Sequence, residues 1–400
     1  MKKQANEKIV LNPPKITSIV VVTSVHPMFD GRIWKHCKSL ARHGVTVHLI
    51  CPWDVPAGVG SGGVIFYPFR RARGILERFA LVPRRINRHL EKLVPIVDVL
   101  HIHDPDLLWL AKNYSHKMAT IYDCHENYDE QIKLRPYVPK MLKPLASSIV
   151  AKIERSLTRR VGNVVLAAPS QGDYFKIPGV RSLLVGNLAS VDLLDSVSEN
   201  WSDRSPAIVF IGTQHERNGS LVFLRAAALL AKRYPSLRFI ASDRFPSADF
   251  RAEYLALASK FNILDRLDLP ANVPAHRIME ILNRGTIAIN PNLRIPQQMR
   301  GNQTKLYEFM AAGLPLVTSD LPHQKKLVEE CESGLVAQPE APQSFADQIG
   351  RILDDDAFRL RLGRNAKQAF REKYCYEQQM PALLDFYASA MALHVDKHKK

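Results

Sequence analysis

The most specific chemical signal in the sequence is the string T-K-L-Y-E-F-M-A-A-G-L-P, which begins at Thr304. Thr304 can cap a helix whose free N–H groups face an anion, and Lys305 adds positive charge there. Glu308 follows one turn later among apolar residues, where a carboxylate is costly unless it has a partner such as a sugar hydroxyl. The string predicts a diphosphate site beside a sugar. A salt-bridged glutamate on an amphipathic helix is the alternative.

Two further polar groups follow apolar runs in the first half. Asp30-Gly31-Arg32 lies at a strand-to-helix turn, where Gly31 permits close backbone approach and the helix start points into an interdomain cleft. This favours contact with a phosphate or with an acceptor substrate. A plain turn with an aspartate cap is the alternative. His125 follows another strand, at the edge where active residues of α/β folds collect. Its alternative role is to order the loop with Glu126.

His101 and His103 share one face of a predicted strand and precede Asp104, which raises the question of a metal site. Because no third ligand has a recognisable spacing, we predict no metal. The five cysteines lie far apart without a C-x-x-C pair, which argues against a disulfide framework or zinc site and favours reduced thiols in a cytosolic setting.

The net charge of +16 fits nucleic acid, an anionic membrane or phosphorylated substrates as partners. From Phe66 to Lys92, basic and apolar residues are interleaved, as on proteins that sit on an anionic leaflet. The predicted membrane patch consists of Arg70, Arg71, Arg84 and Arg85. A sparser group consists of Lys133, Arg135, Lys140 and Lys143 with Tyr137, Met141 and Leu142. A solvated basic face is the alternative. No nucleic-acid-binding signature accompanies the charge, so no nucleic acid is expected.

The elements that must position these residues alternate between short apolar runs and amphipathic stretches, which predicts parallel α/β sheets. In the first half the predicted strands are Ile16–Thr23, Val45–Cys51, Val97–His103, Thr120–Cys124, Val164–Ala168 and Leu183–Gly186, and the helices are Ile33–His43 and Ile149–Arg160. In the second half the strands are Ala207–Gly212, Leu237–Ser242, Thr286–Asn290 and Pro315–Ser319, and the helices are Leu221–Tyr234, Ala252–Phe261, Pro274–Asn283 and Thr304–Ala312.

A polar connector without a clear core face separates the two halves between Asn187 and Pro206. The tail from Ser344 to Lys397 is helical by pattern, and its last segment has an apolar face that needs a host surface. We predict a domain at 1–190, a second at 206–375, and a helix at 376–400 that packs on the first domain. No secretory or membrane-spanning segment is expected.

The T-K-L-Y-E string, together with H-P-M-F-D-G-R-I-W-K from His26, H-I-H-D-P-D-L-L from His101 and Y-D-C-H-E from Tyr122, resembles the retaining glycosyltransferases of family 4. The resemblance spans roughly residues 16 to 390. It implies the GT-B fold, with two Rossmann-like α/β domains facing a central cleft and C-terminal helices returning to the first domain.

The resemblance also implies roles for individual residues. Glu308 matches the glutamate that holds the donor ribose, and His125 matches a histidine next to the transferred sugar. The helix start facing the diphosphate falls on Gln303, Thr304 and Lys305. The remaining residues expected in the site are Gly212 and Leu306 on the donor side, and Asp30, Gly31, Arg32, His103 and Asp104 on the acceptor side.

The sequence departs from the family pattern at two places. Arg300 stands where the family often has a second glutamate, eight residues before Glu308, so the role of that position is unassigned. After Gly212 the usual Gly-Arg pair and the lysine are missing. Arg217 is our candidate for the phosphate contact. An ordinary surface arginine without a ligand is the alternative.

The expected function is retaining transfer of a hexose-type sugar from a UDP- or GDP-sugar to a lipid-linked or oligosaccharide acceptor in cell-surface polysaccharide synthesis. His125, Arg217 and Lys305 are the expected catalytic residues, without cofactor or metal. The predicted location is cytoplasmic, peripheral on the inner face of the cytoplasmic membrane. A nucleotide-sugar epimerase of the same architecture and a non-catalytic basic protein that binds membrane or nucleic acid are the alternatives.

Overall fold

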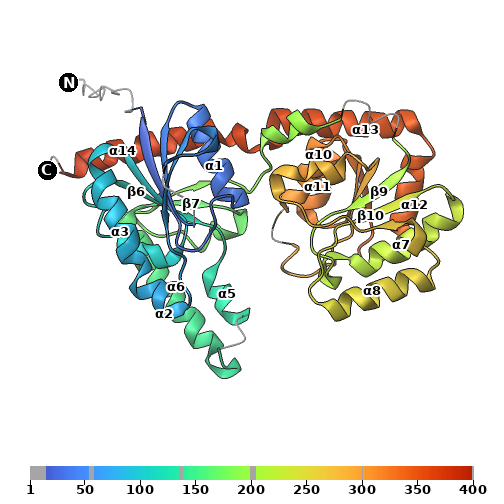
Figure 1. Ribbon diagram of the computed structural model, residues 1–400, viewed down its shortest axis with the longest axis horizontal. Coiled ribbons are helices and arrows are strands. Elements are labelled where there is room, and N and C mark those ends of the chain that lie inside the picture. The colour runs from blue at the N-terminus through green and yellow to red at the C-terminus, as the bar shows by residue number, and fades with distance from the viewer. Residues whose placement is uncertain are drawn as a thin grey trace, which may run out of the picture. The chain divides into compact units, whose positions relative to one another are not determined.

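The computed structural model describes residues 15–53, 58–134, 138–198, 204–299, 301 and 303–398 (Figure 1). The chain divides into two compact units. Unit 1 consists of Met1–Gly186 with Gln379–Lys400, and unit 2 of Asn187–Gln378. Each unit is built on a largely parallel sheet with helices packed against it, so the predicted α/β class is confirmed.

The sheet of unit 1 has the strand order β3-β4-β2-β1-β5-β6-β7-β8, parallel throughout except for the β3–β4 pair. Its strands are β1 (Ser18–Val22), β2 (Thr46–Pro52), β3 (Gly58–Val59), β4 (Val64–Phe69), β5 (Val99–Ile102), β6 (Ala119–Cys124), β7 (Asn163–Leu166) and β8 (Arg181–Leu184). Parallel strands covered on both faces read as continuous apolar runs, which is why most of them were predictable.

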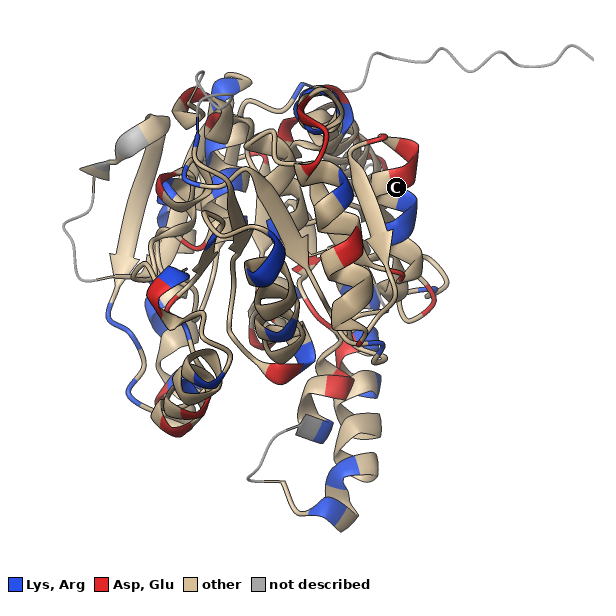
Figure 2. Ribbon diagram, turned by 90° about the vertical axis from the view of Figure 1, so that its right-hand side faces the viewer, with Lys and Arg blue, Asp and Glu red and all other residues tan. Residues whose placement is uncertain are grey.

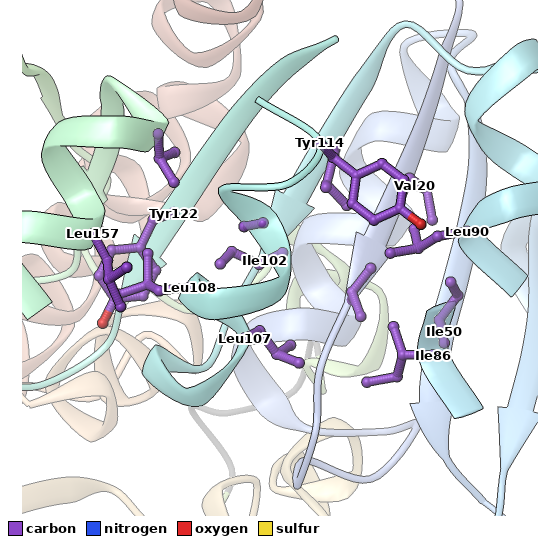
Figure 3. Packing of buried hydrophobic residues seen from close by; sticks show 14 of the residues in the cluster. Val20, Ile50, Ile86, Leu90, Ile102, Leu107, Leu108, Tyr114, Tyr122 and Leu157 are labelled. Carbon is purple, nitrogen blue, oxygen red and sulfur yellow. The ribbon is translucent and has the colours of Figure 1, made fainter. Parts of the chain in front are cut away.

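The helices of unit 1 are α1 (Gly31–Arg42), α2 (Ile75–Ala80), α3 (Val82–Leu93), α4 (Leu108–Ala111), α5 (Tyr128–Leu134), α6 (Lys143–Val161) and α14 (Met380–His398). Figure 3 shows one layer of the core, in which Val20 and Ile50 of the sheet pack with Ile86 and Leu90 of α3. Successive strand residues point to opposite faces of a sheet, and Val21 is also fully buried. Both faces of β1 are therefore covered.

The sheet of unit 2 has the order β11-β10-β9-β12-β13-β14 with parallel pairing. Its strands are β9 (Ala207–Phe210), β10 (Arg238–Ala241), β11 (Leu267–Asp268), β12 (Ile287–Asn290), β13 (Leu316–Ser319) and β14 (Gly334–Ala337). Its helices are α7 (Ser220–Arg233), α8 (Ala248–Lys260), α9 (Met279–Leu282), α10 (Thr304–Ala311), α11 (Pro322–Glu330), α12 (Pro342–Leu353) and α13 (Asp356–Ala369).

Several predicted elements differ from the structure. Helix α6 begins at Lys143 rather than Ile149, because Pro144 is tolerated in a first turn that needs no N–H donor. The predicted helix Pro274–Asn283 is reduced to a 3₁₀ turn and the short α9. The connector has a core face after all, because Ala189 and Leu193 are buried in a cluster of unit 2.

The C-terminal region is helical as predicted, and the apolar face of its last helix has a host. In α14, Leu383, Phe386, Tyr387 and Ala390 are buried, and the helix belongs to unit 1. Among the described residues, every helix is too short or too polar to cross a bilayer.

Candidate functional site

Each sheet contains one place where the strand order reverses, between β1 and β5 in unit 1 and between β9 and β12 in unit 2. Ligands of open α/β sheets bind outside the carboxyl ends of the strands at such a reversal. The polar residues singled out from the sequence follow these strands or their neighbours. Each unit therefore has one candidate site of its own.

In unit 1, Asp104 after β5 organises the loop that follows β1. One carboxylate oxygen accepts hydrogen bonds from the Thr23 hydroxyl and the Ser24 N–H, each at 2.7 Å, and the other lies 3.4 Å from Nε2 of His26. Burial alone would raise the pKa of Asp104, but these hydrogen bonds and the His26 charge outweigh it and lower the pKa. Asp104 is thus a buried carboxylate that fixes the loop.

His26 lies between two carboxylates, because its Nδ1 is 3.1 Å from Asp30. Burial would lower the pKa of His26, but Asp104 and Asp30 outweigh it and raise the pKa to about 10. Asp30 also caps α1 by accepting from the N–H groups of Arg32 and Ile33. The plain capping role weighed for Asp30 is therefore present, and a Cβ at Gly31 would meet no atom within 4 Å.

Arg32 does not point toward an open phosphate site. Its guanidinium is buried and forms a two-pronged ion pair with Asp123 of β6, with a shortest distance of 2.9 Å, and it donates to the Val185 carbonyl. Burial opposes ionisation of Asp123, but Arg32 in first place, with His101 and other histidines, holds its pKa well below the usual range. This corrects the expected role of Arg32, which binds Asp123 within the core.

A row of histidines extends from this ion pair toward the strand ends. His103 Nδ1 lies 2.8 Å from His125 Nε2, and His101 Nε2 lies 3.4 Å from Asp123. His125 is the exposed end of the row, with 13% of its side chain accessible. Burial lowers the pKa of His103 well below its ordinary value and that of His125 to about 4. His125 is therefore neutral at physiological pH and suits hydrogen bonding rather than acid catalysis.

A third possible ligand lies beside His101 and His103, although no spacing in the sequence indicated it. His36 of α1 lies beside them, and His103, Asp123 and His125 form a second group of possible ligand atoms within 4.8 Å of one another. However, the Tyr387 hydroxyl lies 3.0 Å from His36 Nε2 and 2.9 Å from His101 Nδ1. Asp123 is already neutralised by Arg32. We therefore interpret both groups as parts of a hydrogen-bonded network.

In unit 2, the predicted donor residues Gly212 and Lys305 lie together although they are far apart in sequence. A Cβ at Gly212 would lie 3.8 Å from the Lys305 side chain, and Gly212 has φ of 101°, which favours glycine. The Lys305 ammonium lies 5.1 Å from the centre of the Phe210 ring. Burial lowers the pKa of Lys305 to about 7, with Glu308 opposing the shift. An anionic ligand would complete this site.

The start of α10 differs in detail from the prediction. Gln303, and not Thr304, is the N-cap residue, and its side chain caps none of the helix N–H groups. The Thr304 hydroxyl instead donates to the Asn187 carbonyl at 3.0 Å. Leu306 is fully buried in the core, so its side chain is no donor ligand. Glu308 is partly buried one turn later on the same helix.

Sequence reasoning missed a chain of amide side chains that links the loops of this site. Asn292 donates to Gln303, Gln303 to Gln298, and Gln298 to Asn218, with distances of 3.1, 2.8 and 3.0 Å. Asn218 in turn donates to the Thr213 carbonyl at 2.8 Å. We call these four amides the amide relay. It ties the loop after β9 to the start of α10, and its only sequence signal is the presence of amides after strand ends.

Arg217 lies in the loop that the amide relay holds. Its side chain is exposed, and its backbone carbonyl accepts from the Leu293 N–H at 3.2 Å. Gly219 passes so close to Pro291 that a Cβ would lie 1.8 Å from the Pro291 oxygen, so only glycine fits. The loop is therefore fixed against β12, and Arg217 is free to turn toward a ligand. Arg300 lies outside the described residues.

The predicted basic stretch of unit 1 is less open than the sequence indicated. Arg70, Arg71 and Arg84 are exposed, but Arg85 pairs with Glu77 at 2.6 Å and Arg78 pairs with Asp106 at 2.7 Å. The apolar residues divide as well. Phe69 and Val82 belong to the core, whereas Ile75, Leu76, Phe79 and Leu81 are exposed. Arg135 and Tyr137 of the sparser group lie outside the described residues.

Comparisons with known proteins agree on the kind of protein this is. Residues 32–176 match the family model described as Glycosyltransferase Family 4, and residues 205–355 match the model described as Glycosyl transferases group 1. The chain is 21% identical over 347 residues to the alpha-D-kanosaminyltransferase of Streptomyces kanamyceticus, covering 86% of this chain and 77% of that protein. It is 25% identical over 362 residues to the phosphatidyl-myo-inositol mannosyltransferase of Mycobacterium tuberculosis, covering 85% and 89%.

Solved structures show the same architecture. Sucrose-phosphate synthase from Thermosynechococcus elongatus superposes with a TM-score of 0.69 at 15% identity, covering 93% of this chain and 100% of that chain. Anabaena HepE in complex with UDP gives a TM-score of 0.64 at 13% identity, covering 92% and 100%. At these identities the likeness shows the fold, and the predicted GT-B fold is confirmed.

Proposed function

Because the chain belongs to the family 4 glycosyltransferases, we propose that it transfers a hexose-type sugar from a UDP- or GDP-sugar to a hydroxyl of a lipid-linked or oligosaccharide acceptor. The transfer retains the anomeric configuration and contributes to cell-surface polysaccharide synthesis. It takes place on the inner face of the cytoplasmic membrane.

The observation that carries the proposal is the position of Lys305 at the start of α10, beside Gly212. The first N–H groups of a helix have no partner within the helix, and the side chain of Gln303 does not cap them here. Together with the ammonium they form a site for negative charge. Negative charge grows on the diphosphate as the sugar leaves, so preorganised donors there lower the barrier.

Known proteins support a nucleotide donor and a lipid acceptor. HepE was solved with UDP, and starch synthase IV of Arabidopsis thaliana with ADP and acarbose. The mycobacterial relative is by its name a mannosyltransferase acting on phosphatidyl-myo-inositol. These are properties of those proteins, and we extend to this chain the nucleoside diphosphate and the lipid-linked acceptor.

We propose roles for four side chains that agree with their positions in the structure. Lys305 and the exposed Arg217 contact the diphosphate, and Glu308 accepts hydrogen bonds from the ribose. His125, neutral and at the exposed end of its row, hydrogen-bonds a sugar hydroxyl. None of these roles requires a metal ion, so we expect a chelator such as EDTA to leave the rate of transfer unchanged.

The test is a screen of nucleotide sugars against a pool of lipid-diphosphate glycans, read by mass. We expect one donor to yield a product heavier by one sugar residue. Donor alone should yield no new sugar, because conversion between sugars without an acceptor would identify an epimerase. If no nucleotide shifts the unfolding temperature, the protein is instead the non-catalytic alternative, which binds membrane or nucleic acid.

Glu308→Gln tests the donor orientation. The amide keeps the size of the side chain but loses the charge that strengthens hydrogen bonds from the ribose. We expect KM for the donor to rise about tenfold, corresponding to roughly 1.4 kcal/mol. An unchanged KM and kcat would remove Glu308 from the site.

A further inference from the structure

Helices α5 and α6 of unit 1 form an antiparallel pair whose connected ends extend away from the sheet (Figure 1). The outer side of α6 and the turn before it is apolar. We call this surface the α6 face, and its side chains are Met141, Leu142, Leu145, Ile149 and Ile153. Their exposed fractions are 92%, 52%, 61%, 48% and 42%, respectively. In a monomeric protein, a contiguous apolar surface of this kind marks an interaction site.

The spacing along α6 explains why these residues form one surface. Leu145, Ile149 and Ile153 are four residues apart, so they lie one above the other along the helix. Met141 and Leu142 lie in the turn immediately before the helix, at the connected end of the pair. The next residue in the series, Leu157, is buried in the core. The α6 face is therefore the outward continuation of the row that anchors the helix.

The charges along the segment that carries the α6 face are mainly of one sign, whereas the neighbouring α5 carries Asp129 and Glu130 in its first turn. From Val138 to Val161 the basic residues are Lys140, Lys143, Lys152, Arg155, Arg159 and Arg160. The one acidic residue in that segment, Glu154, is buried and accepts hydrogen bonds from Tyr122 and Tyr174 at 2.7 and 2.6 Å. Figure 2 shows the connected end of the pair carrying blue residues without red ones among those described. An anionic partner fits this surface.

A groove continues the α6 face toward α4. It has a volume of about 250 Å³ and is lined by Trp109, Lys112, Lys152, Ile153 and Arg160 among others. The Lys112 ammonium lies 4.5 Å from the centre of the Trp109 ring, and about half of the Trp109 side chain is exposed. Tryptophan, with an apolar body and a polar edge, is common where proteins meet the membrane interface. The groove can accept an acyl chain or glycerol backbone, with cations at its rim for phosphate.

We propose that the α6 face docks unit 1 on an anionic lipid leaflet. Its apolar side chains enter the boundary between head groups and acyl chains, and the surrounding cations bind lipid phosphates. The inference rests on the proposed function only for the reason why the enzyme visits a membrane, since vesicle binding needs no donor and no acceptor.

A second copy of the chain fits the α6 face less well. A two-fold symmetric contact brings the same patch of both copies together, so six basic residues on each side would repel one another. Lysine is also depleted from the cores of protein interfaces, whereas cations beside apolar residues are typical of membrane-binding helices. An anionic leaflet satisfies both the apolar and the charged parts.

The test is sedimentation of the full chain with vesicles of phosphatidylcholine alone or mixed with phosphatidylglycerol. The variant Met141→Ser/Leu145→Ser/Ile149→Ser removes apolar contacts at exposed positions, and Lys140→Gln/Lys143→Gln/Lys152→Gln removes charge. We expect each to lower the partition coefficient for anionic vesicles at least about tenfold. The matched control, Leu76→Ser/Phe79→Ser at exposed positions of α2, lies in the stretch that the sequence predicted as the membrane patch, and with docking through the α6 face we expect at most about a twofold change from it.

Three outcomes would overturn the proposal. The apolar variant could sediment with anionic vesicles as the wild type does, or binding could be lost only in the α2 control. Alternatively, analytical ultracentrifugation could show a wild-type dimer that the apolar variant dissociates, which would assign the face to a second copy. Binding of UDP or GDP is measured in parallel. If nucleotide binding fails while vesicle binding persists, only the proposed function is wrong.

Discussion

The polar groups at the carboxyl edges of the two sheets have different kinds of partners. In unit 1 the buried carboxylates of Asp123 and Asp104 each have a cationic partner, Arg32 and His26 respectively. In unit 2 the described residues of the corresponding edge include the neutral amide relay and Lys305, with the exposed Arg217 next to the relay. The burial that keeps the pKa of Lys305 near 7 is not offset by a full ion pair. The charges at the unit 1 edge are already paired, whereas the unit 2 edge can bind an anion.

The difference indicates what each edge can bind. A surface whose charges are already paired can recognise neutral hydroxyl groups through side chains such as that of His125, of which 13% is accessible. A lysine whose burial disfavours its charge gains from an arriving diphosphate, because the ligand restores the lost solvation.

The largest effect is expected from Arg32→Ala. It leaves the Asp123 carboxylate buried without its ion-pair partner, which typically costs about 3–5 kcal/mol of the free energy of unfolding. Urea unfolding measures the loss. The double variant Arg32→Ala/Asp123→Asn should recover part of it, because the unpaired charge is gone. If the single variant loses less than about 1 kcal/mol, the unit 1 edge does not depend on this pair.

The next effect is expected from Lys305→Met, which keeps the length of the side chain and removes its charge. A hydrogen bond to a charged group contributes about 1.5–3 kcal/mol, so the Kd for UDP or GDP should rise roughly 10- to 100-fold. Isothermal titration calorimetry measures it. The free energy of unfolding should stay the same or rise, since a buried ammonium is removed. Unchanged nucleotide affinity would contradict the proposal that Lys305 at the unit 2 edge binds the diphosphate.

The pH dependence of donor binding also tests whether Lys305 binds the diphosphate. In the free protein Lys305 loses its proton as the pH rises through about 7, and the diphosphate binds the protonated form. The affinity for a nucleotide sugar should therefore fall roughly tenfold from pH 6 to pH 8. Lys305→Arg is the control, because arginine stays charged throughout this range and should give a flat profile. A flat wild-type profile would place the Lys305 pKa elsewhere.

The smallest effect is expected from the amide relay. Gln298→Leu keeps the approximate size but breaks the bonds to Asn218 and Gln303, so the loop after β9 is no longer tied to α10. Loss of donor affinity of about 1 kcal/mol, or roughly fivefold, should follow. Gln343→Leu, which breaks an exposed glutamine pair with Asp347 on α12, is the matched control and should change nothing. Equal effects from both variants would remove the relay from the donor site.

Much of the fold could be predicted because strands buried on both faces have sequences without a polar alternation. Gly212 and Lys305, which the family resemblance indicated as donor residues, lie beside each other at one edge, and their role in donor binding stays a prediction. By contrast, β4, α2 and α3 lie in a stretch whose many arginines obscure the apolar period. There the sequence pattern does not separate the buried Phe69 from the exposed Phe79.

The candidate sites were predicted less completely, because the arrangement of their side chains depends on pairings between residues that are distant in the sequence. Arg32 of α1 looked like a phosphate ligand from its place after a glycine, but its partner Asp123 lies on β6, far away in the sequence. His36, within an ordinary amphipathic helix, gave no sign of lying beside His101. The amide relay had no signal beyond composition, since glutamine and asparagine pair by geometry that only the folded chain provides.

The placement of α14 has a consequence for how the protein is made. The Tyr387 hydroxyl contacts histidines of α1 and β5, so the core of unit 1 is completed by residues that leave the ribosome after all of unit 2. Domains usually fold in the order of synthesis, but here the nascent first half must wait, with part of its apolar surface uncovered, for the last helix. Unit 2 can finish folding first, and chaperone dependence should fall mainly on unit 1.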